Sequence, residues 1–510
     1  MRITPFTLII LLCLNALVAA PKLPKPWEFG QLPTWDAGVR GGIPKVKTKI
    51  EIDAEVLSSK TDPAAFIQSI IDSTKAPAAI LLPKGTYHLT SPLSLKSGIV
   101  LRGQGPKRTI LKFDITLPDT EYTFERPSLG SIRFEGSISE KEISLTDIHL
   151  KGTTTLKIAE ADTFKKGDLI EVFSENDPAL LYTDPRWKRP WADRALGQIV
   201  SIVSIKANTI KIDTPLRLNF YLELNPRIRK IEPIEEAGVE NLGLERIDNS
   251  IDSIIGFEGA LNCWALNCNS FMAGRGHIWV NHSRFVTVQG NEVHHAFSYD
   301  GGGNGYGLVA GNIAVDCLYI DNIAHNLRHS YMAKKGSNGN VFAYNYSHTR
   351  RREPEGEPLL CDISLHGHYP YQNLFEGNVV EYVDLADHWG PTGPDTTFFR
   401  NRIKDKVTIR DYSHHMRFIG NVIQNNGIHP DITVQNTSLL ENILLSAPND
   451  DQPKYEGELP ASLIFESKPG FWGDDLAWPS IGPDSDNSQD IVIPAQHRWE
   501  KSKKLSDMDS

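Results

Sequence analysis

Side chains that can exchange protons or bind an anion gather in one part of this 510-residue chain. Half of its sixteen histidines lie between His325 and His415, with lysine, tyrosine and arginine among them. Removing a proton from the carbon next to a carboxylate requires a base, an acid and a group that neutralises the carboxylate. These residue types supply all three. The segments concerned read HSYMAKKG at 329–336, DISLHGHY at 362–369, VDLADHW at 383–389 and KVTIRDY at 406–412.

A repeated phrase in the same region predicts the scaffold that positions these residues. Short apolar segments end in asparagine at intervals of 20 to 33 residues, at Asn291, Asn322, Asn345, Asn378, Asn401, Asn421 and Asn442. Such a period, built from short β-type segments, predicts chain turns stacked on one another. The two longest intervals each hold an insertion beside the cluster, glycine-rich at 298–307 and arginine-rich at 349–358. We expect these insertions to form walls of a cleft.

Alternation along each strand predicts which side chains share a face. Aliphatic residues such as Met332, Ile363 and Leu365 are assigned to the interior, and Lys335 is preferred to Lys334 because alternation turns Lys334 inward. Four successive coils, about 4.8 Å apart, then present their polar residues on one face. These residues are His329, Tyr331, Lys335, Asp362, Ser364, His366, His368, Asp384, His388, Arg410 and Tyr412.

These residues suit the cleavage of a uronate chain by β-elimination. Lys335 or His368 is the candidate base, and Tyr331 or His329 is the candidate acid. His366 and Arg410 are candidates for neutralising the carboxylate. Further substrate contacts are expected from Asp384, His388, Arg351 and Tyr412.

The N-terminal part of the chain carries a more specific resemblance. A helix from Ala64 to about Ser73 precedes LLPKGTYHLTSPLSLKSGIVLRGQGPKRTILKF, which holds PKGTY at 83–87 and GQG at 103–105. This stretch resembles the opening coils of the pectate-lyase-like superfamily. The resemblance covers residues 50–115, and the asparagine-marked coils extend it to about residue 445. It implies an all-β fold, a right-handed parallel β-helix with an N-terminal capping helix.

This fold hosts several activities, so alternatives stay open. HGH at 366–368 and RIK at 402–404 resemble motifs of polygalacturonase-type hydrolases, although the acidic motifs expected before them are missing. A hydrolase using Asp362, Asp384 or Asp387 is the near alternative, and a non-catalytic glycan-binding or structural β-helix is the more distant one. Metal-assisted lyases of the superfamily place a lysine before a marker asparagine, as Lys335 precedes Asn345. Their calcium ligands are not evident here, which leaves Ca²⁺ open as a cofactor.

The rest of the chain sets the boundaries and the expected partners. Residues 1–20 read as a signal peptide, which predicts a secreted or periplasmic protein with no membrane span. We assign 21–129 to the cap and first coils, 130–227 to an inserted antiparallel β-subdomain, 228–446 to the main coils and 447–510 to a closing segment and mobile tail. Within the insertion, LLYTDPRWKRPWADR (180–194) is interpreted as a packing flap rather than the wall of a sugar cleft.

Charge and cysteine content narrow the partners further. The net charge of −10 argues against nucleic acid as a partner. We expect a monomer that acts on an acidic polysaccharide. The cysteines after residue 20 match no zinc pattern and are interpreted as small buried hydrophobic residues, with a disulfide left open.

Overall fold

The computed structural model describes residues 32–115, 130–248, 252–351, 360–386, 388–410, 412–413, 415–424, 427–430, 438–440, 443–444 and 459–508. The predicted signal peptide, Asp387 and Asn442 lie outside these residues. The chain divides into the units Met1–Leu32 and Pro33–Ser510, and the second unit is described here. Among the described helices, none has the length and apolar character needed to cross a membrane.

Two short helices close the N-terminal end of the stack, where one capping helix was predicted. They are α1 (Ala54–Ser58) and α2 (Pro63–Ser73), and the side chains of Asp53 and Asp62 accept hydrogen bonds from their first backbone N–H groups. Helix α2 buries Ala64, Ile67 and Ile71 against the first coil. The end of the β-helix is thereby shielded from water.

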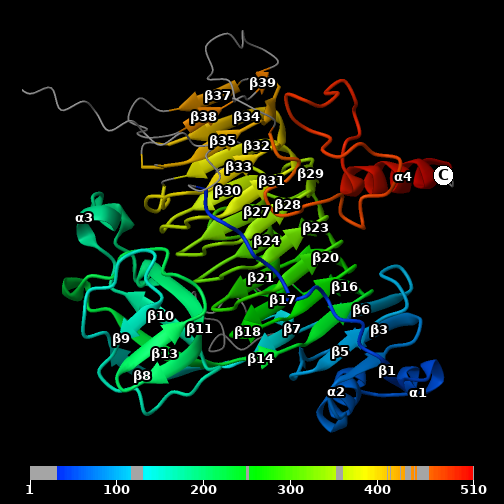
Figure 1. The fold of residues 1–510 in the computed structure, drawn as a ribbon. Coiled ribbons are helices and arrows are strands. Elements are labelled where there is room, and N and C mark those ends of the chain that lie inside the picture. Colours follow the sequence, from blue (N-terminus) through cyan, green and yellow to red (C-terminus); the bar gives the residue numbers. More distant parts are fainter. Residues whose placement is uncertain are drawn as a thin grey trace, which may run out of the picture. The chain divides into compact units, whose positions relative to one another are not determined.

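The coils form three faces, because each coil contributes three short strands that pair in parallel with the coils on either side (Figure 1). The first face is a 12-stranded sheet. It consists of β1 (Thr48–Glu51), β2 (Ala78–Leu81), β5 (Ile99–Arg102), β15 (Gly238–Glu240), β19 (Trp264–Leu266), β22 (Thr287–Gln289), β25 (Leu318–Ile320), β28 (Val341–Ala343), β31 (Leu374–Glu376), β33 (Thr397–Phe399), β35 (Arg417–Ile419) and β38 (Ser438–Leu440).

The second and third faces are two rows of one 19-stranded sheet, which β32 (Val379–Ala386) and β34 (Arg402–Ile409) join by running through both. The second face also holds β3 (Gly85–Leu89), β6 (Thr109–Phe113), β16 (Gly243–Arg246), β20 (Asn269–Ala273), β23 (Glu292–Ala296), β26 (Ile323–His325), β29 (Tyr346–His348), β36 (Val422–Ile423) and β39 (Ile443–Leu444). The third also holds β4 (Leu93–Ser94), β7 (Gly130–Glu135), β17 (Ser253–Glu258), β21 (Gly276–Asn281), β24 (Tyr306–Ala310), β27 (His329–Lys334), β30 (Ile363–His366) and β37 (Gly427–Pro430). The predicted parallel β-helix is confirmed.

Two ladders of identical or similar side chains hold successive coils in register. Inside the first face, Tyr319 and four phenylalanines stack almost parallel, with ring centroids 4.4 to 4.9 Å apart. At the corner between the first and second faces, the marker asparagines form a buried chain of hydrogen bonds from Asn291 to Asn421. Each side-chain oxygen accepts from both the backbone and the amide N–H of the preceding asparagine. The repeated phrase therefore marks the same corner of successive coils from Asn291 to Asn421.

An antiparallel subdomain interrupts the early coils. Its six strands are β8 (Ser137–Ser144), β9 (Thr155–Lys157), β10 (Leu169–Ser174), β11 (Leu196–Lys206), β12 (Thr209–Ile212) and β13 (Arg227–Glu232). The short helices α3 (Pro178–Leu181), η2 (Pro185–Trp187), η3 (Pro190–Ala192) and η4 (Leu222–Leu224) belong to its loops, and a small parallel pair, β14 (Ile234–Glu235) and β18 (Ala260–Leu261), follows it. Because β7 pairs in parallel with β4 and β17, the insertion begins after residue 135, later than predicted.

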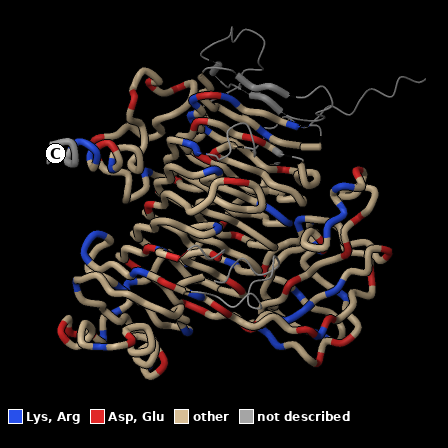
Figure 2. The backbone as a smooth tube through the Cα atoms, turned by 180° about the vertical axis from the view of Figure 1, so that it is seen from behind, with Lys and Arg blue, Asp and Glu red and all other residues tan. Residues whose placement is uncertain are grey.

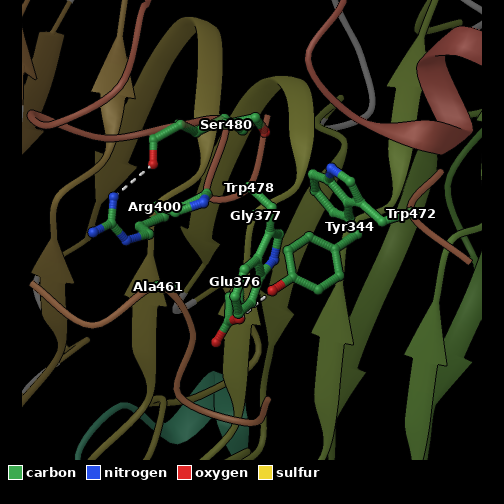
Figure 3. A pocket seen from close by; sticks show the side chains of 10 residues that line it. Tyr344, Glu376, Gly377, Arg400, Ala461, Trp472, Trp478 and Ser480 are labelled. Atoms are coloured by element: carbon green, nitrogen blue, oxygen red, sulfur yellow. Dashed lines mark hydrogen bonds between the residues drawn. The ribbon is translucent and has the colours of Figure 1, made fainter. Parts of the chain in front are cut away.

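Of the region predicted as a closing segment and mobile tail, residues 459–508 are described, and they fold against the coils. This segment ends in α4 (Pro494–Met508), where Arg498 pairs with Asp321 and Trp499 packs on two histidines of the second face. Tyr344, Glu376, Arg400, Trp472 and Trp478 line a pocket between the coils and this segment, in which Glu376 accepts a hydrogen bond from the Tyr344 hydroxyl (Figure 3). Glu376 also accepts one from the Leu463 backbone amide. Burial raises the pKa of the Glu376 carboxyl. We interpret this pocket as the anchor of the C-terminal segment.

The four cysteines in the described part of the chain are all free and buried. Burial raises the pKa of each thiol, as expected of a side chain that serves as a small hydrophobic residue.

Candidate functional site

Strand register on the third face corrects the predicted assignment of side chains. Tyr331 pairs with Ile363, and both lie in the hydrophobic core between the faces. Lys334 pairs with His366 on the outer side. The outward lysine is therefore Lys334 and not Lys335, which follows the strand in a turn with a φ of 42°. Met332, predicted to point inward, packs outside against Trp279 and Tyr306.

Lys334 lies between two tryptophans. Its Nζ atom is 5.2 Å from the ring centroid of Trp191 and 5.5 Å from that of Trp279. Burial, followed by the positive charges of Arg275 and Lys335, lowers the pKa of Lys334 to about 7. Within the described residues Lys334 forms no salt bridge. Such a lysine is a neutral amine in a large fraction of molecules at neutral pH, which is the form that acts as a base.

His366 and His368 belong to the same cluster. The His366 ring lies in the coil next to Lys334, and burial together with the charge of Lys334 lowers its pKa to about 3. Its Nδ1 atom is 3.2 Å from the Gly367 carbonyl oxygen, so Nε2 carries the lone pair. His368 is fully buried and bonds the Trp187 carbonyl oxygen through Nε2 at 2.8 Å, which fits a positioning role better than that of a base.

The loop at 178–194 extends from the subdomain to this face. One part of it is a packing flap, and another part lines the site. Trp187 is buried and holds His368, so part of the loop is a packing flap. Trp191 is partly exposed and lines the site, with its ring centroid 5.3 Å from His368 and 5.9 Å from Trp389. The Arg189 guanidinium lies over the Trp389 ring. Tryptophans and an arginine thus make an amphipathic wall, the type of surface that suits a sugar.

The glycine-rich insertion flanks the same cluster. Arg275 donates to the Gly302 carbonyl oxygen at 2.6 Å, and Arg328 donates to the Asn304 carbonyl oxygen at 3.0 Å. These arginines also act electrostatically on the cluster, Arg275 on Lys334 and Arg328 on His366. The two guanidinium groups therefore fix the loop and make the potential around Lys334 more positive. Elsewhere, positive and negative residues alternate over the molecule (Figure 2).

The predicted acidic residues Asp362 and Asp384 are both engaged with other groups of the protein. Asp384 accepts a two-pronged contact from Arg410, with distances of 3.1 and 2.9 Å, and a further hydrogen bond from the Tyr382 hydroxyl. Asp362 is buried and accepts from the Ser347 hydroxyl and two backbone amides. Burial raises the pKa of Asp362 to about 6. Arg410 was predicted to bind the substrate carboxylate, and Asp384 was predicted to contact the substrate. In the structure these two side chains bind each other instead.

The remaining predicted residues divide between core and periphery. Tyr331 and His329 are buried, with the Tyr331 hydroxyl donating to the Tyr346 carbonyl oxygen and His329 Nδ1 beside Cys361, so neither is positioned as the acid. His388 and Tyr412 lie at the rim, against Trp389 and Trp187. Arg351 is exposed above the Tyr299 ring, and the rest of its loop, 352–359, lies outside the described residues.

The donor atoms around Lys334 do not fit calcium, which takes six to eight oxygen ligands. They come from lysine, histidine and arginine side chains, and no step is assigned to a calcium ion. Alternation along 329–336 favoured Lys335 over Lys334, and the register of β27 reverses that choice. Trp191, by contrast, stands 143 residues earlier and carries only a weak signal, the aromatic and basic composition of 180–194.

The chain has distant matches among solved structures. No curated protein matches the chain. Among solved structures, the tailspike protein gp49 from Pseudomonas phage LKA1 is 13% identical, with 83% of this chain and 81% of that chain covered and a TM-score of 0.46. The A-module of the Azotobacter vinelandii mannuronan C-5 epimerase AlgE4 is 14% identical (78% and 94% covered, TM-score 0.34). An alginate lyase from Paenibacillus sp. str. FPU-7 is 8% identical (77% and 96% covered, TM-score 0.34).

A family model gives the more specific match. Residues 58–161 match the family described as rhamnogalacturonase A/epimerase, pectate lyase-like. The matched stretch contains PKGTY at 83–87 and GQG at 103–105, from which the resemblance was predicted. Over its first coils, the chain is therefore pectate-lyase-like, as its sequence indicated.

Proposed function

We propose that this protein is a carbohydrate-active enzyme that cleaves an acidic, uronate-containing glycan by β-elimination, with Lys334 as its base. The observation that carries the proposal is a lysine with a pKa of about 7, set between two tryptophans and surrounded by cations. A positive, aromatic-lined site suits a carboxylate-bearing sugar. The family match over residues 58–161 supports a carbohydrate substrate.

The proposed reaction uses one residue twice. The neutral Lys334 amine removes the proton on C5 of the uronate, and the electron pair of that bond forms the C4=C5 double bond as the C4–O4 bond breaks. The Lys334 ammonium then returns the proton to the leaving O4, so the enzyme is regenerated. The positive charges of Lys335 and Arg275 stabilise negative charge developing on the carboxylate. His366, neutral because its pKa is about 3, accepts a hydrogen bond through Nε2 from a sugar hydroxyl.

Hydrolysis is the competing reaction, and it requires two carboxyl groups flanking the glycosidic bond. In the described part of the third face, Asp384 is held by Arg410 and Asp362 is buried. Incubation with a panel of uronate polysaccharides separates the reactions. Elimination produces the ultraviolet absorbance of an unsaturated uronate, whereas hydrolysis produces reducing ends without it. Glycan binding with neither product would overturn the proposal in favour of a non-catalytic role.

The pH dependence of kcat/KM follows from the lysine. The base must be neutral, so we expect kcat/KM to rise as pH increases through about 7 and then to level off. Steady-state rates measured from pH 5 to 9 on one substrate check this. A profile that falls as pH rises through 7 would show that the group must be protonated, and Lys334 would then not be the base.

Folding stability provides a check on the same pKa that does not depend on turnover. The Lys334 pKa is lowered from 10.5 to about 7 on folding, so between these values the unfolded chain binds more protons. Lys334 therefore makes stability increase with pH across that window. We expect this contribution to be lost in Lys334→Met, as measured by urea unfolding at pH 7 and pH 9.

Trp191→Ala tests the aromatic wall. Removing the indole admits water beside Lys334, which moves the pKa of the amine upward toward its ordinary value. We expect KM to rise and the midpoint of the kcat/KM profile to shift to higher pH. Trp187→Phe is a poor control because Trp187 is buried. Tyr221, exposed just before η4, offers Tyr221→Ala instead. A Trp191→Ala profile identical to wild type would contradict the assigned contact.

A further inference from the structure

We propose that His294, His295 and His325 form a binding site for one divalent transition-metal ion of the zinc class, which joins two adjacent coils of the second face. Each of these residues offers a ring nitrogen, and the three nitrogens lie within 4.8 Å of one another. Among the described histidines, cysteines, aspartates and glutamates, this is the one group of three or more that meets that distance. The inference is independent of the proposed reaction.

Strand register brings the first two rings together. His294 on β23 pairs with His325 on β26, and their rings stack with centroids 4.5 Å apart and planes 9° from parallel. A tetrahedral ion with metal–nitrogen bonds of about 2.0–2.1 Å holds its ligand nitrogens about 3.3–3.4 Å apart. Binding of an ion therefore requires the ring nitrogens to move closer together, and the nearly parallel rings of His294 and His325 to tilt so that both lone pairs point to it.

His295 joins them through a backbone turn that recurs from coil to coil. Consecutive residues of a strand point to opposite sides, so His295 would ordinarily face away from His294. Its φ of 60° places it in the left-handed region, and Met272, Asn326 and Thr349, at the same register position of other coils, also have positive φ. The turn therefore belongs to the fold, and this coil places a histidine at it. The Nδ1 atoms of His294 and His295 lie 2.9 Å apart.

The opposite nitrogens of the stacked rings have polar partners. His325 Nε2 lies 3.1 Å from a Glu292 carboxylate oxygen, and His294 Nε2 lies 3.4 Å from the Asn269 side-chain oxygen. These contacts place the proton on Nε2 and leave the Nδ1 lone pair for a metal, the arrangement found around metal-bound histidines. The Nδ1 atom of His325 accepts a hydrogen bond from the side-chain amide of Asn326, and this amide must turn aside when an ion binds. Imidazole nitrogens are ligands that suit zinc, copper and nickel.

Ring packing alone explains part of the arrangement. Phe271, His294, His325 and His348 form one column, and Trp499 of α4 packs on His325 and His348. His295 stands edge-on to Phe271, His294 and His325, with planes 70°, 79° and 88° apart, which is also a favoured packing of rings. Ring packing does not require three ring nitrogens to lie within 4.8 Å of one another, and the metal accounts for that convergence.

Titration of the full chain, produced without a histidine tag and stripped with a chelator, tests the site. We expect calorimetry to show one Zn²⁺ bound per chain, and Co²⁺ to give the intense visible absorption of a tetrahedral nitrogen site. His294→Phe retains the ring stack and removes a ligand, so it should lower the Zn²⁺ affinity at least about tenfold. His348→Phe, the same exchange one coil further along the column, should leave the affinity unchanged.

A second ligand variant guards against misfolding. His295→Gly removes the ligand, and glycine accepts the positive φ without strain. We expect this variant to bind Zn²⁺ more weakly than the wild type. We also expect it to lack the increase in melting temperature that Zn²⁺ gives the wild type. Circular dichroism confirms that each variant is folded. Absence of Zn²⁺ binding by the wild type, or equal losses in His294→Phe and His348→Phe, would overturn the proposal.

Discussion

Lys334→Met is expected to lower kcat for uronate elimination by about 10²- to 10⁴-fold, the range associated with loss of a general base. Methionine retains an unbranched side chain that can lie between Trp191 and Trp279, so the wall of the site is preserved. The amine that accepts the C5 proton and returns it to O4 is lost. Because both proton transfers depend on one residue, a second side chain does not restore the rate.

Lys335→Met is the matched control, because the two lysines are adjacent and carry the same charge. Lys335 contributes positive potential but does not share the outer position beside His366. We expect Lys335→Met to raise KM for the acidic substrate and to affect kcat only modestly. The Lys334 pKa should be higher in this variant than in the wild type, because one of the positive charges that lower it is removed. Initial rates over a range of substrate concentration separate kcat from KM. Loss of kcat in Lys335→Met with retention in Lys334→Met would reverse the assignment and restore the choice made from alternation alone.

A small amine supplies a further test of the same role. In Lys334→Ala the truncated side chain leaves space for an exogenous amine. We expect methylamine to recover part of the rate in proportion to its neutral fraction. Failure of every amine tried, combined with full activity of Lys334→Met, would remove the base from this position.

The fold was predictable because its signals are local and repeated. The marker asparagines recur once per coil, and each of those in the described residues occupies the same buried corner, so one phrase reports the period of the whole stack. PKGTY and GQG likewise report the first coils, which lie in the matched family segment. The C-terminal segment lacks any such repeat. Its docking depends on long-range contacts such as Arg498 with Asp321, which composition does not indicate.

The site was predictable as a region but not as a set of side chains. Tyr331 and Met332 are both apolar enough to fill an interior, so either of them could point inward from β27. The two choices differ by one residue, and such a shift exchanges every side chain of the strand between the inner and the outer side. The structure takes the solution in which the Tyr331 hydroxyl finds a buried carbonyl oxygen. Pairing of Asp384 with Arg410 joins neighbouring coils, and the approach of Trp191 depends on the insertion. Neither contact follows from spacing along one strand.

Asn345→Ala is expected to destabilise the fold strongly while leaving the side chains around Lys334 in place. The Asn345 side-chain oxygen accepts from the backbone and side-chain N–H groups of Asn322, and its Nδ2 donates to the Tyr319 carbonyl oxygen and to Asn378. Alanine leaves these buried groups unpaired in a site that is 0% exposed. The loss amounts to about 3–5 kcal/mol of unfolding free energy.

Urea unfolding followed by ellipticity measures that loss, with Asn208→Ala as the control. Asn208 lies in the exposed turn between β11 and β12 and makes one side-chain hydrogen bond, to the Ala159 carbonyl oxygen, so its removal should cost little. Because a stack of coils can open locally, hydrogen exchange at the Asn322 amide gives a second measurement. We expect protection there to fall in Asn345→Ala and to persist in Asn208→Ala. Equal unfolding free energies for the two variants would show that the asparagine chain records the coil period without stabilising it, and the register would then depend on the aromatic ladder from Tyr319 to Phe418.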